Sequence, residues 1–526
     1  MKASHPSQSL RLAFVPFILA YVVYSLPGIT RPWGNDHNGF LTKEKSGFAI
    51  NYLKFGFWDT KFGQKMDEGG TLDSSLKRYS YYVRHPMGIS VLTAFSFMLF
   101  GVTEWASRLI AILLNVSILA LLYRFFEDYW DQETALLALF FVVFSPMFFY
   151  IRHLLAFELL ALFFISAILY LYVKWQRTGH RRYRSLLFGA VLLGTLLSDW
   201  QTYFLVPAIA AHNFFFATRK EKKVFLLLPL ACVSFLAYVA YVKWLTGSIH
   251  GEGAGGGLWG NMLLRMNLSD TASSANISAG KWVAFFVNHY GAFYTPLLGA
   301  LTILFFARCI VKLIARRGLT EQEGLLVCCF LAFTSYFAVF SHAYMCCEFM
   351  NLLFLPVSGL FGATLLLAIP RLFDRSIGGP MRRLLGGTLV GACIAFFLIL
   401  SYPRARTIYV IQNMELPLNN FFAAQKDNII VSFDEDGSFY QLRPYLQLRT
   451  VRRIRTVNDL EAALRDVTSR FGFVVLKRGE SGDPGLQPYL SARYPSQLIA
   501  NVRFEQYDFF DVRSGTRLRT QERPGG

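Results

Sequence analysis

Repeated apolar runs, each able to form a helix across a bilayer, constrain the fold of this chain more than any other feature. A helix needs about 20 predominantly apolar residues to cross the hydrocarbon core. Charged residues make up 16% of the chain, against about 25% in an average soluble domain. We therefore predict an all-α polytopic membrane domain of about eleven transmembrane helices, at residues 12–29, 107–123, 134–150, 154–173, 186–197, 202–216, 224–242, 283–307, 324–341, 350–369 and 384–400.

Basic residues are concentrated in short loops between these runs, which accounts for the net charge of +18 without a nucleic-acid partner. The positive-inside rule places such loops in the cytoplasm. All of them are cytoplasmic if the N-terminus is cytoplasmic and the short apolar run 86–100 does not cross the membrane. We therefore expect residues 86–100 to form a helix in the outer interface. The basic loops are 174–184, 219–223, 308–317 and 371–383.

This topology divides the chain into a transmembrane domain, residues 1–402, and a small extracytoplasmic α/β domain, residues 403–526. Strands are expected at 428–433 and 471–477, and a helix at 457–470. The first run is expected to be a retained signal anchor, because no small-residue cleavage site follows it. Two outer loops remain, at 30–105 and 246–281. The second contains the glycine-rich stretch 251–257, which is typical of either a mobile lid or a flexible connector.

Ionisable side chains collect at the outer face, whereas the centres of the spans are nearly free of charge. Charged groups next to hydrocarbon are costly and tend to mark function. Each also has a structural alternative: Arg152 could reach the lipid headgroups, Asp199 could cap the following helix, and Asp36-His37 could belong to a solvated loop. The outer-face residues are Asp36, His37, Arg84, His85, Arg152, Glu158, Asp199, His342, Tyr344 and Glu348.

Such a face suits transfer of a group from a lipid-linked phosphate. A cation would hold the phosphate at headgroup depth, and a carboxylate would deprotonate an acceptor hydroxyl that attacks the anomeric carbon of a sugar. Neither a P-loop nor a GxGxxG motif follows a strand in this sequence. The seven cysteines lie in or beside apolar runs without metal-ligand spacing, so we interpret them as packing residues.

An ordered series of motifs resembles the GT-C membrane glycosyltransferases, specifically the protein O-mannosyltransferases and lipid A aminoarabinose transferases. The series begins with Asp36-His37 after the first span and continues with residues 81–86, 101–109 and 145–158 before it ends at Asp199-Trp200. The resemblance covers residues 12–210 well and the later helices by hydropathy. It implies the GT-C fold and transfer from a polyprenyl-phosphate-linked sugar.

Carried over position by position, the resemblance implies that Asp36 is the general base. It also implies that His85 faces the lipid phosphate, with Arg84 as a rival, and that Arg152 and Glu158 lie near the donor sugar. Three positions depart from the family pattern: His37 replaces a glutamate, His85 a lysine, and Glu158 a common aspartate. The catalytic candidates are Asp36 and Glu158, and the candidates for binding the donor are His37, Tyr81, Tyr82, Arg84, His85, Arg152, Asp199, His342 and Tyr344.

We therefore expect an integral membrane glycosyltransferase, in the inner membrane of a bacterium, with its C-terminal domain outside. It would transfer a sugar to a lipid, polysaccharide or protein acceptor. Nothing in the sequence demands a metal. His37, His85 and His342 could contribute to a divalent metal site, but no metal-ligand spacing supports one. A transporter is one alternative, but it would require polar groups near the midplane and an internal repeat, and the sequence shows neither. A non-catalytic scaffold for envelope assembly is the other alternative.

Overall fold

The computed structural model consists of two compact units. The helical unit comprises Met1–Ile29, Val83–Ile89 and Arg108–Val410, and the mixed unit comprises Thr30–Tyr82, Ser90–Ser107 and Ile411–Gly526. The residues that the structure describes are 13–33, 37–65, 81–249, 257–266, 268, 279–341, 347–372, 379–412, 417–424, 427–431, 451–454, 456–465, 471–477, 483–500 and 506–513.

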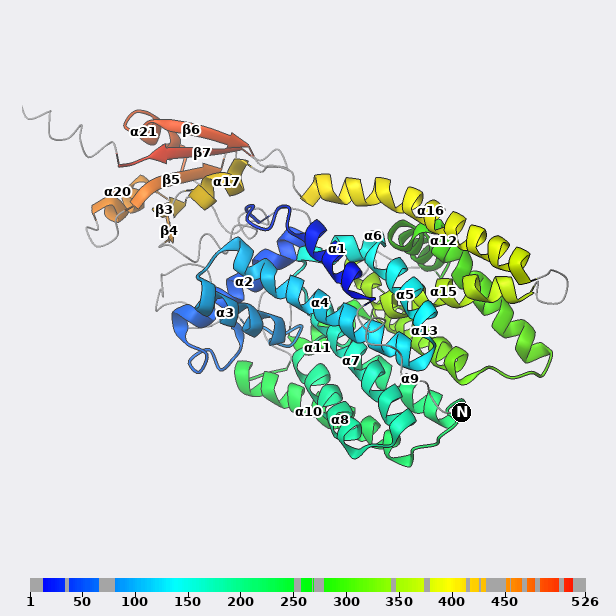
Figure 1. Ribbon diagram of the computed structural model, residues 1–526. Coiled ribbons are helices and arrows are strands. Elements are labelled where there is room, and N and C mark those ends of the chain that lie inside the picture. Colours follow the sequence, from blue (N-terminus) through cyan, green and yellow to red (C-terminus); the bar gives the residue numbers. More distant parts are fainter. Residues whose placement is uncertain are drawn as a thin grey trace, which may run out of the picture. The chain divides into compact units, whose positions relative to one another are not determined.

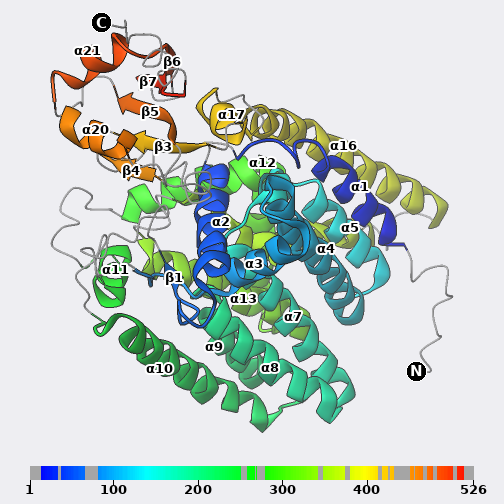
Figure 2. The same cartoon turned by 90° about the vertical axis from the view of Figure 1, so that its left-hand side faces the viewer.

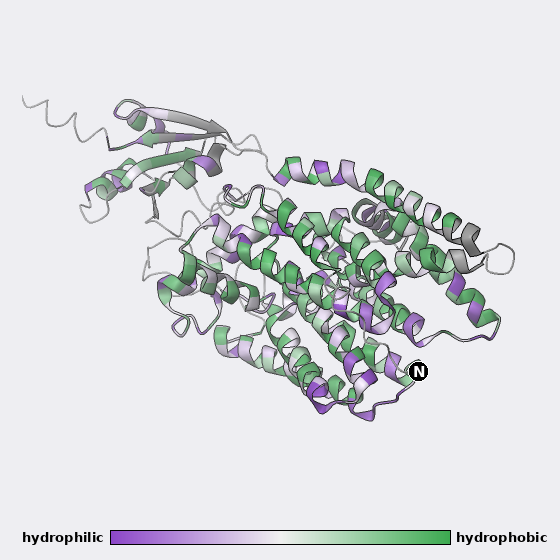
Figure 3. Ribbon diagram, in the orientation of Figure 1, coloured by the Kyte–Doolittle hydropathy of each residue, from purple (hydrophilic) through white to green (hydrophobic). Residues whose placement is uncertain are grey.

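The helical unit is a bundle of helices (Figures 1 and 2). Hydrophobic residues dominate most of these helices, and hydrophilic residues collect at several helix ends (Figure 3). The helices are α1 (Val15–Ser25), α4 (Glu104–Tyr129), α5 (Gln132–Val143), α6 (Pro146–Tyr150), η2 (Ile151–His153), α7 (Phe157–Thr178), α8 (Arg181–Leu197), α9 (Gln201–Phe215), η3 (Lys222–Leu226), α10 (Leu227–Thr246), α11 (Leu258–Arg265), α12 (Ala279–Ile314), α13 (Glu321–Val339), η5 (Glu348–Phe354), α15 (Leu355–Leu372) and α16 (Gly379–Gln412).

Seven helices among the described residues are long and apolar enough to cross a membrane, and a bent pair adds an eighth. The pair, Gln132–Val143 and Pro146–His153, bends by 52°, where Ser145 caps α6 and Pro146 occupies its first turn. The three other predicted runs coincide with helices of 11, 17 and 15 residues, namely α1, α8 and α9. The predicted all-α membrane fold is thereby confirmed, and the protein is an integral membrane protein.

The mixed unit combines most of the loop 30–105, called the first outer loop after its predicted location, with the C-terminal region. The loop contributes α2 (His37–Phe55), most of α3 (Gly88–Phe100) and the short strands β1 (Gln64–Lys65) and β2 (Tyr81–Tyr82). Helix α3 lies within the apolar run 86–100, and its position in the outer interface stays a prediction. The C-terminal part contains α17 (Pro417–Ala424), β3 (Asn428–Val431), β4 (Val451–Arg453), α20 (Val457–Arg465), β5 (Phe471–Lys477), α21 (Leu486–Ser491), β6 (Ser496–Ala500) and β7 (Gln506–Asp511).

Five of these strands form one sheet in the order β4-β3-β5-β7-β6. Strand β3 pairs in parallel with β4 and β5, whereas β7 pairs antiparallel with β5 and β6. Successive side chains of a strand point to opposite faces of its sheet. Val474 and Leu476 of β5 accordingly pack with residues of α20 and α21. Phe473 and Val475 pack in a second core with residues of α2 and α3. The sheet is therefore covered on one side by the first outer loop.

Helix α16 continues through Pro403 to Gln412. It thus extends about two to three turns beyond residue 402, where the sequence analysis begins the C-terminal domain. Helix α20 begins where the predicted helix 457–470 begins and is described as far as Arg465.

Candidate functional site

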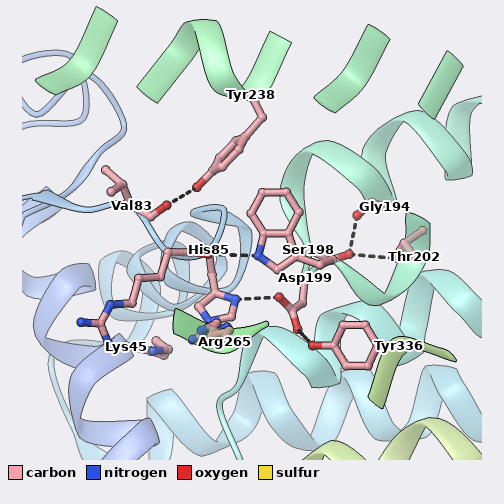
Figure 4. A network of polar contacts seen from close by, with 12 residues as sticks. Lys45, Val83, His85, Gly194, Ser198, Asp199, Thr202, Tyr238, Arg265 and Tyr336 are labelled. Atoms are coloured by element: carbon pink, nitrogen blue, oxygen red, sulfur yellow. Dashed lines mark hydrogen bonds and ion pairs between the residues drawn. The ribbon is translucent and has the colours of Figure 1, made fainter. Parts of the chain in front are cut away.

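A buried polar cluster surrounds the turn between α8 and α9. Ser198 at this turn donates its hydroxyl hydrogen to the carbonyl of Gly194, and its oxygen lies 3.2 Å from the hydroxyl of Thr202. The next residue, Asp199, is completely buried. Its carboxylate has partners from other parts of the helical unit, and the N-cap residue of α9 is Trp200, without a side-chain capping bond. The cluster is drawn in Figure 4.

His85 is the first partner of this carboxylate, and its two ring nitrogens have different neighbours. Nδ1 lies 2.6 Å from Oδ1 of Asp199, and Nε2 lies 2.7 Å from a terminal guanidinium nitrogen of Arg265. A guanidinium can donate hydrogen bonds but cannot accept them. Nε2 therefore accepts, and the proton of a neutral His85 is on Nδ1, from which it is donated to Asp199.

Aromatic residues hold both the carboxylate and the segment that carries His85. Tyr336 of α13 donates to the second carboxylate oxygen of Asp199 at 3.2 Å. Tyr238 of α10 donates to the carbonyl of Val83 at 3.0 Å, and the indole of Trp200 donates to the carbonyl of Arg84 at 3.1 Å. The two residues before His85 are thus fixed through their backbone (Figure 4).

Opposite charge keeps Asp199 ionised in spite of its burial. Burial alone would raise the pKa of this carboxyl, but the neighbouring His85 and Arg265 lower it, and the pKa lies below its ordinary value. The imidazole of His85 also stacks on the ring of Phe157, with ring centres 4.6 Å apart. The arrangement leaves Arg265 as the fixed cation of the cluster, with His85 connecting it to the buried anion.

Arg152 and Glu158 are both buried, on either side of the break before α7. Arg152 lies in η2 with no exposed surface, and its guanidinium carbon lies 4.0 Å from the ring centre of Phe149. An arginine that reached headgroups would be exposed, so that structural alternative does not apply. Glu158 is in the first turn of α7, beside Phe157, on whose ring His85 stacks. The structure thus brings His85, Asp199 and the start of α7 together.

Other sequence candidates are described in part or lie outside the described residues. Asp36, His342 and Tyr344 lie outside them, and His37 begins α2 without a described side chain. The backbone carbonyl of Arg84 accepts the bond from Trp200, and its side chain is half-buried. Tyr81 and Tyr82 form β2 in the mixed unit, where the ammonium of Lys45 lies 5.1 Å from the ring centre of Tyr82.

Two polar partners of His85 and Asp199, namely Arg265 and Tyr336, are not among the residues predicted from the sequence. Arg265 ends the short helix α11 after an otherwise uncharged stretch, Leu258–Leu264, and that isolated charge is a signal which could have identified it. Tyr336 belongs to an apolar span and carries no comparable signal. Within the described part of the chain, no group of three His, Cys, Asp or Glu side chains is placed to hold a metal ion.

Comparisons with known proteins bear on a stretch of the sequence and on the fold. Residues 84–244, which contain His85, Arg152, Glu158 and Asp199, match the family model described as dolichyl-phosphate-mannose-protein mannosyltransferase. The fold is similar to the crystal structure of ArnT from Cupriavidus metallidurans bound to undecaprenyl phosphate. The TM-score is 0.55 and the identity 11%, over 94% of this chain and 97% of that one.

A second similar structure is the apo form of the oligosaccharyltransferase from Archaeoglobus fulgidus. Its TM-score is 0.51 and its identity 11%, over 94% of this chain and 73% of that one. No curated protein sequence matches the chain. The chain therefore has the GT-C fold of membrane glycosyltransferases, as the order of its motifs predicts.

Proposed function

We propose that this protein is a membrane glycosyltransferase that moves a sugar from a polyprenyl-phosphate-linked donor to an acceptor on the extracytoplasmic face. The observation that carries the proposal is the buried cluster of Arg265, His85 and Asp199 in a chain with the GT-C fold. Most of the cluster lies in the stretch that matches the mannosyltransferase model. Support for the donor class comes from the similar ArnT structure, which is bound to undecaprenyl phosphate.

Arg265 is the proposed ligand of the donor phosphate. Its guanidinium has five N–H donors in a planar fork, which suits two-point binding of a phosphate. One of its nitrogens contacts His85 at 2.7 Å, and that contact sets the direction of the side chain. Asp199 and Tyr336 act as positioning residues, because they fix the tautomer and orientation of His85 rather than contacting the donor themselves.

The proposed general base is Asp36, and Glu158 is the second catalytic candidate. Asp199 is poorly suited to this role, because its carboxylate already accepts bonds from His85 and Tyr336 and its pKa is lowered. A general base works best when its pKa lies near the operating pH. Arg152 and the other donor-binding candidates, His37, Tyr81, Tyr82, Arg84, His342 and Tyr344, are proposed to surround the donor sugar and phosphate.

The proposed location is the inner membrane of a bacterium, with the N-terminus in the cytoplasm and the C-terminal region outside. Helix α8 begins with the basic residues 181–184 and ends beside Asp199. If the basic end is cytoplasmic, the cluster lies at the outer face, where a lipid phosphate headgroup would meet it. The acceptor class is a lipid, polysaccharide or protein.

Turnover by the purified full-length protein in lipid nanodiscs tests this function. The protein is given a panel of polyprenyl-phosphate sugars with lipid, polysaccharide and peptide acceptors, and donor consumption is measured. We expect consumption by the wild type and none by Asp36→Asn. The matched control is Asp59→Asn, an exposed aspartate of the same loop, which should behave as the wild type.

Equal consumption by Asp36→Asn and the wild type would transfer the role of base to Glu158. A wild type that neither consumes any donor nor is thermally stabilised by one would contradict the proposal. That result would favour the non-catalytic scaffold.

A further inference from the structure

A buried glutamine, Gln201, lies beside the polar cluster but makes none of its hydrogen bonds. It is the first residue of α9, two positions after Asp199, and its side chain is completely buried. Among the residues that the structure describes, neither its amide oxygen nor its amide nitrogen has a hydrogen-bond partner. Other buried amides, such as those of Asn115 and Gln176, leave one atom unsatisfied but bond through the other.

The surroundings of Gln201 place its amide in the candidate site. The amide lies next to the hydroxyl of Tyr336, but not in hydrogen-bonding geometry with it. That hydroxyl donates to Asp199 (Figure 4). Glu158 and Arg265 are near enough to act on the same hydroxyl electrostatically. Because Asp199 and Glu158 are buried as well, a ligand that reaches them enters a region closed to solvent, and Gln201 is part of that region.

An unsatisfied amide is an unusual group to bury. At least about 90% of buried polar groups in proteins are hydrogen-bonded, because a buried donor or acceptor without a partner reduces stability. An apolar side chain of the same shape would avoid that loss. A glutamine at position 201 therefore indicates a partner from outside the described part of the chain.

The chemistry of the amide restricts the kind of partner. Its Oε1 only accepts hydrogen bonds, and its Nε2 only donates them. An ionised phosphate only accepts and would leave Oε1 unsatisfied, whereas a cation would leave the N–H groups unsatisfied. A hydroxyl group both donates and accepts, so one hydroxyl or two neighbouring hydroxyls can satisfy both atoms. Such groups are supplied by a carbohydrate or by water.

We infer that the amide of Gln201 hydrogen-bonds hydroxyl groups of the sugar that the proposed enzyme transfers, which makes Gln201 a specificity-determining residue. The inference rests on the proposed function, because it concerns the sugar of the same donor. The amide and Arg265 lie around the same Tyr336 hydroxyl. A sugar is bonded directly to the phosphate that Arg265 is proposed to bind, so its hydroxyls are the groups of the donor that come next to this amide.

The test compares Gln201→Met with the wild type, as purified full-length protein in lipid nanodiscs. Methionine is unbranched and flexible like glutamine, but it lacks the amide. One ligand is undecaprenyl phosphate, which carries no sugar. The other is the undecaprenyl-phosphate sugar that the wild type binds most tightly in a panel of such lipids.

The matched control is Gln176→Met. Gln176 is a buried glutamine of α7 that donates to Asn213 at 2.9 Å. It is 18 residues from Glu158 on the same helix, which corresponds to about 27 Å, so it lies away from the proposed site.

We expect Gln201→Met to bind the sugar-linked lipid about 5- to 150-fold more weakly, which corresponds to the loss of two neutral hydrogen bonds. It should bind undecaprenyl phosphate as the wild type does. The melting temperature of the ligand-free protein should not fall, because no hydrogen bond to another described residue is lost. Gln176→Met should show the opposite pattern, with a lower melting temperature and unchanged affinities.

Two outcomes would overturn the inference and leave the glycosyltransferase proposal intact. The first is a melting temperature that falls as in Gln176→Met, with an unchanged affinity for the sugar-linked lipid, since the partner of the amide would then be a buried water. The second is equal weakening of both ligands, since Gln201 would then act on the phosphate. A wild type that binds none of the sugar-linked lipids would contradict both proposals.

A second measurement removes hydroxyls from the ligand and can be made on the wild type. Each monodeoxy form of the sugar-linked lipid lacks one hydroxyl. At least one of these forms should bind the wild type at least about twofold more weakly, the loss of one neutral hydrogen bond. That loss should vanish in Gln201→Met, because two partners of one bond are not additive. Equal losses in the two proteins, or no loss for any monodeoxy form in the wild type, would overturn the inference.

Discussion

The guanidinium of Arg265 donates a hydrogen bond to Nε2 of His85, and this contact decides which ring nitrogen carries the proton. Because Nε2 accepts, the proton is on Nδ1 and is shared with Asp199. In a neutral His85, Nε2 is therefore the acceptor, and the fixed positive charge of the cluster resides on Arg265. At the position where the family pattern of the resemblance implies a lysine, this chain has His85, in contact with an arginine from a distant helix.

The first prediction is that Arg265→Gln weakens donor binding without greatly changing the chemical step. A hydrogen bond to a charged group contributes about 1.5–3 kcal/mol, so the KM for a polyprenyl-phosphate sugar should rise about 10- to 150-fold. The kcat should stay within about threefold, because binding is lost equally in the ground and transition states. Steady-state kinetics in nanodiscs measures both constants.

Arg465→Gln is the control for Arg265→Gln. The Arg465 side chain is 76% exposed and pairs with Glu461 on the surface of α20, so its loss should leave both constants unchanged. A large fall in kcat for Arg265→Gln with an unchanged KM would contradict the role in binding and assign Arg265 to the reaction itself.

His85 and Asp199 stand out as candidates in the sequence, but the contact of His85 with Arg265 could not be predicted. Ionisable residues at the ends of apolar runs are conspicuous, because charge next to hydrocarbon is costly. By contrast, Arg265 is 180 positions from His85, and neither hydropathy nor spacing pairs residues at that separation. Their contact is a property of the tertiary fold.

The C-terminal sheet illustrates the same limit at the level of a domain. The apolar run 471–477 predicts a buried strand, and β5 occupies those residues. However, the run has large apolar residues on both faces and does not tell which elements cover them. In the structure, one face packs on α20 and α21, and Phe473 packs with residues of the first outer loop.

A second prediction concerns His212, which stabilises the helical unit away from the proposed site. Its Nδ1 lies 2.7 Å from the hydroxyl of Tyr172, and its Nε2 donates to the carbonyl of Glu321 at 3.0 Å. The side chain is completely buried. His212→Phe leaves these partners unsatisfied, so the free energy of unfolding should fall by about 1–3 kcal/mol for each buried group.

Thermal unfolding in detergent measures the effect of His212→Phe, and the KM of the surviving folded enzyme for its donor should not change. His180→Phe is the matched control, because His180 is exposed at the start of α8. A raised KM with an unchanged melting temperature would contradict a purely structural role for His212.

A third prediction is that Phe473→Ala loosens the first outer loop as well as the sheet. The side chain is 6% exposed and belongs to the core that contains Ala94 and Phe97 of α3. Truncation of a buried phenylalanine costs about 3–5 kcal/mol. Hydrogen exchange of α3 amides should therefore accelerate in this variant.

Leu490→Ala provides the comparison for Phe473→Ala, because Leu490 is buried in the core on the opposite face of the sheet. It should accelerate exchange mainly in α20 and α21. Equal acceleration of α3 in the two variants would contradict the assignment of the two faces to separate cores.

The last prediction concerns the dependence of stability on pH through Asp199. The folded-state pKa of this carboxyl lies below its ordinary value, because the effects of His85 and Arg265 exceed that of burial. A carboxyl with a lowered folded pKa binds fewer protons in the folded state, so its contribution to stability is fully present above its unfolded pKa of about 3.9. It is lost as the pH falls below that value toward the folded pKa.

Thermal unfolding of the wild type and Asp199→Asn should differ by a constant amount from about pH 5 to pH 7, and the difference should shrink below about pH 4. Asp131→Asn, in which the cap of α5 is altered, controls for the general loss of an aspartate. A difference that grows as the pH falls would mean that Asp199 is protonated more readily in the folded state. The assignment of a lowered pKa to Asp199 through His85 and Arg265 would then be wrong.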